Sequence, residues 1–347
     1  MKLDNYLSQG KTYIIAEMSG NHGGSLDKAL AIVHAAAKAG ADCLKIQTYT
    51  ADTITINSHT PPFLLGKGLW ENEYLYDLYQ KAYTPWEWTG PIMDACRAEG
   101  MDFLSTPFDF TAVDFLEQAG IECYKIASFE LVDIPLIRRV AQTGKPMIVS
   151  CGMGTREEID EAVRTIRAAG NENFVLLKCC SAYPSDPDTM YLRTIPDMRE
   201  RFGVPVGLSD HSEGTAAAII AVSLGAQVIE KHMCLTSEDK TVDSAFSMSA
   251  EEFAQLVKDI RRAEKSLGSV HYGPSPEEAE SLRIRRSLFA VKDIRKGEPF
   301  TAENVRSIRP ASGLHTRYYD TLLSGKTASR DIPFGSPLQA SDIAEGL

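Results

Sequence analysis

Short runs of apolar residues alternate with longer segments of helical periodicity from the N-terminus to about residue 267. The first helical segment, 26–39, has residues at both ends that favour a helix boundary. Ser25 is a favoured N-cap residue, and Gly40 ends the segment. The short runs are apolar almost throughout rather than at every second position, which is typical of strands buried on both faces. The alternation therefore predicts parallel strands connected by helices.

Eight of these runs are each followed by a helical pattern. We predict strands at 13–19, 43–49, 102–107, 123–128, 146–152, 174–180, 206–211 and 228–232. Eight such units predict an α/β fold, a (β/α)8 TIM-type barrel, with its active site at the C-terminal ends of the strands. An open doubly wound sheet is the alternative. The absence of a G-x-G-x-x-G motif after the first strand counts against a dinucleotide-binding version of it.

One connection is much longer than the others. Residues 50–84 separate the second strand from the next regular helix and carry the aromatic stretch Leu69–Tyr76. An excursion of this length at the C-terminal end of a strand is often functional.

The pattern changes after residue 267. Residues 268–284 contain Gly273-Pro274-Ser275-Pro276 and are predicted to form a linker. Residues 285–347 are predicted to form a small β-rich domain, near the lower size limit for independent folding. A related phrase occurs in it twice, at 293–300 and at 331–338. The predicted organisation is therefore a barrel domain at 1–267, a linker and a C-terminal domain.

Composition limits the classes of binding partner and the cellular compartment that we expect for this protein. The chain has 347 residues and a formal net charge of −11, which argues against nucleic acid or an anionic membrane as a partner. A local cluster of lysines would still allow an anionic small substrate. No apolar run approaches membrane-spanning length, and the start does not match a signal peptide. The seven cysteines form no C-x-x-C pair, which disfavours a structural zinc site and suits a reducing cytoplasm.

Two histidines supply the first candidate chemistry. His211 and His232 end the seventh and eighth predicted strands, with the helical segment 216–225 between them. In a strand–helix–strand unit both strands end at the same edge of the sheet, so the two side chains are expected side by side. Two neutral imidazoles at one edge can bind a divalent metal. The alternative is two unrelated histidines that form hydrogen bonds in loops.

Other polar residues gather at the same predicted rim. They are Glu17, Lys45, Gln47, Ser105, Thr106, Lys125, Ser128, Glu130, Ser150, Cys180, Ser181, Tyr183, Ser209, Glu230 and Asp243. A lysine within a barrel strand is costly unless it faces a ligand or a partner, and two lysines with several hydroxyls suit a phosphate site. The alternative for each lysine is a salt bridge at the barrel mouth, with Glu17 or Glu130.

Six motifs carry a family resemblance. The stretches IIAEMSGNHGGSLDKA, ADCLKIQTYTADT, YKIASFE, MIVSCGMGT, GLSDHSEG and VIEKHMC resemble the sialic acid synthase family, and the C-terminal region resembles its antifreeze-like (SAF) domain. The resemblance implies an enzyme that condenses phosphoenolpyruvate with an N-acylated amino sugar, giving a nonulosonic acid and phosphate. It also implies a divalent metal, Mn²⁺ or Mg²⁺, and a homodimer in which the SAF domain of one chain covers the barrel of the other.

The resemblance assigns roles by matching positions. It implies His211 and His232 as metal ligands and catalytic residues, and Glu17 as a carboxylate close to metal and substrate. It implies a phosphoenolpyruvate site made by Lys45, Lys125, Ser128, Ser150 and Ser209. It implies Glu130, Tyr183 and Asp243 around the sugar, and Arg309 as the arginine that a second chain contributes. Glu17 and Glu130 are the candidate catalytic carboxylates: either could stabilise the positive charge at the pyruvyl C2 or activate the attacking water.

Two features distinguish branches of the family. Ser181 stands where the sialic acid synthases have asparagine, which counts against N-acetylmannosamine as the sugar. The stretches KIQTYTADTITIN and GLWENEYLYDLYQKAYTPWEW resemble the branch that uses 2,4-diacetamido-2,4,6-trideoxy-β-L-altropyranose, with Ser181 near the substrate. The alternatives are a synthase of N-acetylneuraminate or legionaminate, a non-catalytic carbohydrate-binding SAF protein, and an aldolase-type barrel that forms a Schiff base through Lys45 or Lys125.

Overall fold

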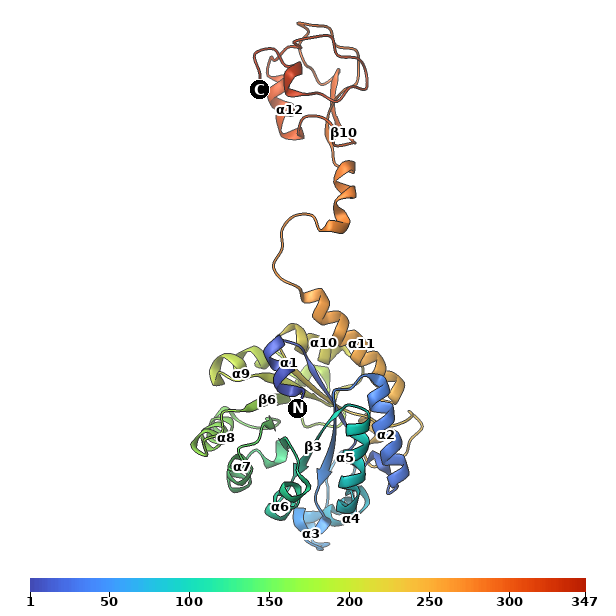
Figure 1. Ribbon diagram of the computed structural model, residues 1–347, viewed down its shortest axis with the longest axis vertical. Helices are drawn as coiled ribbons and strands as arrows, with labels where there is room; N and C mark the ends of the chain where they lie inside the picture. Colours follow the sequence, from blue (N-terminus) through green and yellow to red (C-terminus); the bar gives the residue numbers. More distant parts are fainter. The chain divides into compact units, whose positions relative to one another are not determined.

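Eight parallel strands close into a barrel in the computed structural model, which describes residues 1–347 (Figure 1). The strands are β1 (Tyr13–Glu17), β2 (Cys43–Thr48), β3 (Asp102–Pro107), β4 (Tyr124–Ile126), β5 (Met147–Ser150), β6 (Phe174–Cys179), β7 (Val206–Asp210) and β8 (Val228–His232). Each strand pairs with the next, and β1 pairs with β8 to close the ring. The predicted (β/α)8 barrel is confirmed, and the observed strands lie within the eight predicted runs.

A helix follows each strand and packs outside the barrel. The helices are α2 (Leu26–Ala39), α5 (Thr89–Ala98), α6 (Phe110–Ala119), α7 (Ile134–Ala141), α8 (Arg156–Ala168), α9 (Thr194–Phe202), α10 (Ala216–Ser223) and α11 (Ala250–Leu267). The Ser25 hydroxyl accepts a hydrogen bond from Lys28 N at the start of α2, and Gly40 ends it with φ 93°. The excursion after β2 contains two further short helices, α3 (Ala51–Ile54) and α4 (Leu75–Ala82).

The N-terminal helix α1 (Leu3–Gln9) was not predicted. It has seven residues and no capping side chain, so it offers too little periodicity for recognition from sequence. Leu3 is 1% exposed and packs with Tyr13 and Ile15 of β1. The Tyr6 hydroxyl donates to Asp42 Oδ1 at 2.7 Å. Tertiary packing therefore stabilises a helix that its own sequence barely specifies.

The barrel interior changes character along the strands. Its N-terminal part is filled by one apolar cluster: Tyr13, Ile15, Cys43, Leu104, Cys123, Ile148, Val175, Leu177 and Val228. Side chains alternate between the two faces of a strand, so the residue two positions further along points to the same side. For β1, β2 and β8 those positions are Glu17, Lys45 and Glu230. The apolar filling thus positions a polar layer at the C-terminal end.

The chain divides into two compact units, Met1–Gly268 and Ser269–Leu347. The second contains an antiparallel pair, β9 (Ser287–Ala290) and β10 (Val305–Ile308), and the helix α12 (Tyr319–Leu323). Its two related phrases pair with each other: Ile294 and Ile332 exchange backbone hydrogen bonds of 2.9 and 2.8 Å. No helix in either unit is both long and apolar enough to span a membrane.

Candidate functional site

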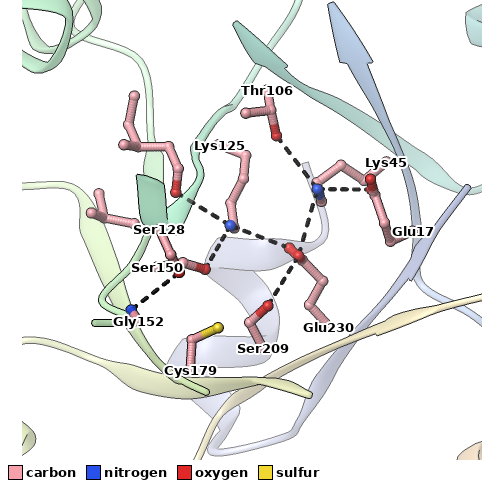
Figure 2. A network of polar contacts seen from close by, with 12 residues as sticks. Glu17, Lys45, Thr106, Lys125, Ser128, Ser150, Gly152, Cys179, Ser209 and Glu230 are labelled. Atoms are coloured by element: carbon pink, nitrogen blue, oxygen red, sulfur yellow. Dashed lines mark hydrogen bonds and ion pairs between the residues drawn. The ribbon is translucent and has the colours of Figure 1, made fainter. Parts of the chain in front are cut away.

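Two lysines and two glutamates meet inside the C-terminal end of the barrel (Figure 2). Lys45 Nζ lies 2.8 Å from Glu17 Oε2 and 3.5 Å from Glu230 Oε1. Lys125 Nζ lies 3.8 Å from Glu230 Oε2. We call these four residues the charged quartet, and none is more than 3% exposed. Burial of an isolated charge would cost many kcal/mol. The four side chains can be buried together because each lysine faces a glutamate of opposite charge.

Burial and pairing shift the pKa values within the quartet. Burial raises the pKa of Glu17, even beside the Lys45 ammonium. Burial alone would lower the pKa of Lys45, but the facing carboxylates outweigh it and raise that pKa. The pKa of Lys125, which faces the more distant carboxylate of Glu230, is lowered by burial. Burial alone would raise the pKa of Glu230, but the two lysines hold it below its ordinary value. Glu230 is therefore the carboxylate that stays ionised between two cations.

Three serine hydroxyls extend the quartet. Lys125 Nζ donates to Ser150 Oγ at 2.6 Å, and Ser209 Oγ donates to Glu230 Oε1 at 3.3 Å. Ser128 Oγ accepts from Gly152 N at 3.1 Å (Figure 2). A Cβ at position 152 would lie 2.7 Å from Ser128 Oγ and closer still to Ser181 Oγ. Glycine at 152 is therefore required for this close approach of backbone and hydroxyls.

The two predicted metal-ligating histidines lie side by side at the same end of the barrel. The His211 and His232 ring centroids are 5.3 Å apart. His211 Nδ1 lies 2.9 Å from the Cys180 carbonyl, which leaves Nε2 free. Burial lowers the pKa of His232 well below its ordinary value, so this imidazole is neutral, and its buried Nδ1 has no hydrogen-bond partner.

Metal binding is consistent with these two imidazoles. A neutral imidazole with an unsatisfied buried nitrogen beside a second imidazole is a suitable donor pair for a divalent metal. No group of three or more His, Cys, Asp or Glu side chains is arranged to hold a metal ion. The protein would therefore supply two ligands and leave the remaining coordination positions to substrate and water.

A buried thiol contacts the first of these histidines. Cys179 Sγ lies 3.8 Å from His211 Nδ1 and 3.7 Å from Ser181 Oγ. Burial alone would raise the pKa of Cys179, but the interaction with His211 outweighs it and lowers the pKa to about 7. The same contact opposes the effect of burial on His211 and raises the pKa of that imidazole. Cys179 thus links Ser181 to the histidine pair.

Three more predicted residues border this region. The Tyr183 ring centroid is 4.5 Å from that of His211. Asp243 Oδ2 accepts from Gly20 N at 2.8 Å, and burial raises the pKa of this carboxyl. Glu130 follows β4, its Oε2 is buried without a hydrogen-bond partner, and burial raises its pKa to about 7. Of the two carboxylates considered as lysine partners, Glu17 forms the salt bridge and Glu130 does not.

Five of the predicted rim residues had no predicted role, and three of these five, Gln47, Thr106 and Glu230, contact Lys45 or Glu17. Glu230 faces both lysines, and the signal was its position two residues before His232, on the same face of β8. Gln47 Nε2 donates to Glu17 Oε1 at 3.0 Å and fixes that carboxylate. Thr106 Oγ1 accepts from Lys45 Nζ at 3.4 Å.

Arg309 lies in the second unit, directly after β10, and is exposed. Its predicted role in the site of a second chain stays a prediction.

The fold is that of a barrel enzyme, and its buried charged side chains gather at the C-terminal ends of the strands, where the active sites of such barrels lie. The chain belongs to the NeuB family, whose model matches residues 32–272, and residues 285–344 match the SAF domain. The predicted membership of the sialic acid synthase family, with its SAF domain, is confirmed.

Individual relatives cover nearly the whole chain. It is 44% identical over 343 residues to the pseudaminic acid synthase of Campylobacter jejuni, covering 99% of this chain and 100% of the relative. It is 42% identical over 335 residues to the pseudaminic acid synthase of Helicobacter pylori, covering 96% and 98%. Among solved structures, the N-acetylneuraminic acid synthetase of Leptospira borgpetersenii in complex with citrate matches with a TM-score of 0.70 at 29% identity, over 78% of this chain and 90% of that one.

Proposed function

We propose that this protein is a pseudaminic acid synthase. It would condense phosphoenolpyruvate with open-chain 2,4-diacetamido-2,4,6-trideoxy-β-L-altropyranose and water, giving the nonulosonic acid and phosphate. The observation that carries the proposal is the charged quartet, which presents two buried ammonium groups at the end of the barrel where such enzymes work. The 44% identity to a pseudaminic acid synthase over 99% of the chain supports the choice of sugar.

The quartet and the serines would hold phosphoenolpyruvate. Lys45 and Lys125 would face the anion, and the hydroxyls of Ser128, Ser150 and Ser209 would donate to its oxygens, with Ser181 close to them. Charge-assisted hydrogen bonds of this kind are stronger than neutral ones, and their donors are already fixed by the barrel strands. The lysines would also stabilise the phosphate that leaves.

His211 and His232 would hold the divalent metal, Mn²⁺ or Mg²⁺. When bound, the metal would act as a Lewis acid that polarises the sugar aldehyde and orients it. The Cys180 carbonyl would fix the His211 ring so that Nε2 faces the metal. Tyr183 and Asp243 would border the sugar.

The two predicted carboxylates would divide the remaining work. The enol carbon of phosphoenolpyruvate bonds to the aldehyde carbon, the aldehyde oxygen takes up a proton, and positive charge develops at the pyruvyl C2. Glu17, fixed by Gln47 and Lys45, would stabilise that charge. Water then adds to C2 and gives its proton to Glu130, whose pKa of about 7 and unpartnered Oε2 suit a general base. The hydroxyl left on C2 gives its proton to the departing phosphate as the C2–O bond to phosphate breaks with its electron pair on phosphate, and C2 becomes the ketone. The proton received by Glu130 balances the one that the aldehyde oxygen took up.

The protein would work as a homodimer in the cytoplasm. Arg309 of one chain would complete the sugar site of the other, with the SAF domain covering that barrel. All seven cysteines are free, which suits a reducing compartment.

The test of the proposed function measures phosphate release in the presence of Mn²⁺ and phosphoenolpyruvate. Three sugars are compared in parallel: the trideoxy altrose, the sugar that a legionaminate synthase uses, and N-acetylmannosamine. Release that requires the altrose is expected, and a chelator should abolish it. Release only with another of the sugars would keep the chemistry and overturn the choice of substrate. No release with any of them would overturn the proposed function.

A further inference from the structure

One aromatic residue connects the excursion after β2 to the loop after β8. Trp70 Nε1 donates to the Val242 carbonyl at 3.0 Å. Its ring centroid lies 5.7 Å from that of Tyr183 and 6.1 Å from that of Phe246. These three side chains come from three different loops at the C-terminal ends of the strands, and we call them the aromatic wall.

The aromatic wall stands directly beside the histidine pair. The Tyr183 and Phe246 ring centroids are 4.9 Å apart. Tyr183 lies 4.5 Å from His211, and Phe246 lies 4.8 Å from His232, again between ring centroids. Val242, which accepts the Trp70 hydrogen bond, is followed immediately by Asp243. A sugar that reaches the histidines and Asp243 is therefore next to the wall.

The wall offers mostly ring carbon to a ligand. The only polar atom of Trp70 is already bonded to Val242, and Phe246 has none. Tyr183 adds one hydroxyl, and burial raises its pKa, so the hydroxyl stays neutral. A methyl group gains by leaving water for such a surface, whereas a hydroxyl loses its hydrogen bonds to water without replacement.

We propose that Trp70, with Tyr183 and Phe246, receives the methyl group at C6 of the sugar, and that Trp70 is a specificity-determining residue. This inference rests on the proposed function. At C6 the trideoxy sugar has a methyl group where N-acetylmannosamine has a hydroxymethyl group. The excursion would thus select for 6-deoxy sugars by closing one side of the site with an indole ring.

The experiment compares kcat/KM for two sugars that differ only at C6. The first is the trideoxy altrose, and the second is its 6-hydroxy analogue. Trp70→Ala should lose roughly 10-fold to 100-fold in kcat/KM with the trideoxy sugar, the range for one methyl-sized difference in an apolar pocket. It should change by less than about 3-fold with the 6-hydroxy analogue, and KM for phosphoenolpyruvate should stay constant.

Two further variants keep the result interpretable. Trp70→Phe retains an aromatic face and should keep most of the preference for the trideoxy sugar, even if Trp70→Ala folds poorly. Leu69→Ala alters the neighbouring residue, 41% exposed and outside the wall, and should behave as the wild type. A thermal melt of each variant checks its fold.

The possible results separate the two proposals. An equal loss with both sugars in a folded Trp70→Ala protein, or an unchanged preference, would overturn the inference and leave the proposed function intact. Absence of turnover by the wild type with the trideoxy sugar would overturn the proposed function, and the role of the wall with it.

Discussion

The charged quartet shows why single residues in this site are not interchangeable. Glu230 faces Lys45 at 3.5 Å and Lys125 at 3.8 Å, so it compensates two buried cations at once. Loss of one partner from a buried pair typically costs about 3–5 kcal/mol, because a charge is left unpaired. Glu130 lies outside these pairs. Burial raises the pKa of Glu130, and the influence of Lys125 is too weak to offset that rise.

The pKa of Glu130 predicts a pH-dependent stability. The folded protein holds this proton up to about pH 7, whereas the ordinary value of 4.5 applies to the unfolded chain. The folded state therefore binds more protons across this interval, and the carboxyl makes the free energy of unfolding fall as pH rises through it. Glu130→Gln removes the effect, so its stability relative to the wild type should rise between pH 4.5 and 7 and then stay constant. The gain should be no more than about 3 kcal/mol.

Urea denaturation at a series of pH values measures this difference. Lys125 and Asp133 are the charged groups that also influence Glu130, and they are unchanged in the variant. Glu122→Gln, at a side chain 70% exposed, controls for the loss of one negative charge. Parallel curves for wild type and Glu130→Gln from pH 4.5 to 8 would refute the assignment.

At the scale of elements, the outward-facing residues of β7 and β8 hold the loop that carries His211. Lys231 Nζ lies 2.8 Å from Asp210 Oδ2 and also donates to the Ser212 and Gly214 carbonyls. Asp210 Oδ1 accepts from Ser212 N at 2.9 Å and from its hydroxyl at 2.6 Å. Inward positions of the same strands carry residues of the candidate site, so these strands present site residues on one face and the residues that hold the His211 loop on the other.

A double variant tests this support. Lys231→Met alone would leave Asp210 buried and unpaired, and should lose about 3–5 kcal/mol of stability. Asp210→Asn/Lys231→Met removes both charges and keeps the acceptor for Ser212, so most of that stability should return. The loop carbonyls would still lack the ammonium, so Mn²⁺ affinity should fall roughly 10-fold to 100-fold, as for other groups that orient metal ligands. Mn²⁺ binding is measured by calorimetry. If the folded double variant binds Mn²⁺ as tightly as the wild type, Asp210 and Lys231 contribute only to stability.

The sequence predicted the elements that repeat and missed contacts that join distant segments. Lys45, His211 and His232 could be placed at one rim because parallel strands in a barrel end at the same edge. The pairing of Glu230, rather than Glu130, with the lysines depends on which face of each strand points inward and on strand register. Trp70 meets Tyr183 and Val242 across more than a hundred residues of chain, and no local pattern encodes that contact. Helix α1 depends on the barrel against which it packs.

The predicted site residues are divided unequally between the two compact units of the molecule. The barrel unit, Met1–Gly268, contains every predicted site residue except one. Arg309 belongs to the other unit, which has its own core of residues such as Leu288, Phe300 and Val305. If Arg309 acts in the barrel site as predicted, it does so either within its own chain or in a partner chain, and the two arrangements lead to different expected results.

Complementation between two defective chains distinguishes them. His211→Ala and Arg309→Ala should each be nearly inactive, and Arg309→Ala should raise KM for the sugar more than KM for phosphoenolpyruvate. If Arg309 acts on the partner's barrel, a mixed dimer has one intact site: the barrel with His211 receives Arg309 from the His211→Ala chain. Random co-assembly of equal amounts in a twofold dimer then restores about a quarter of wild-type activity.

The matched control pairs His211→Ala with His232→Ala. Both changes affect the histidine pair of a single barrel, so no mixed dimer regains an intact site, and co-expression should restore nothing. Recovery with Arg309→Ala but not with His232→Ala would require a site shared between chains. A shared site would give activity in every mixed dimer of His211→Ala and Arg309→Ala chains. If both mixtures sediment as dimers and neither regains activity, Arg309 therefore acts within its own chain.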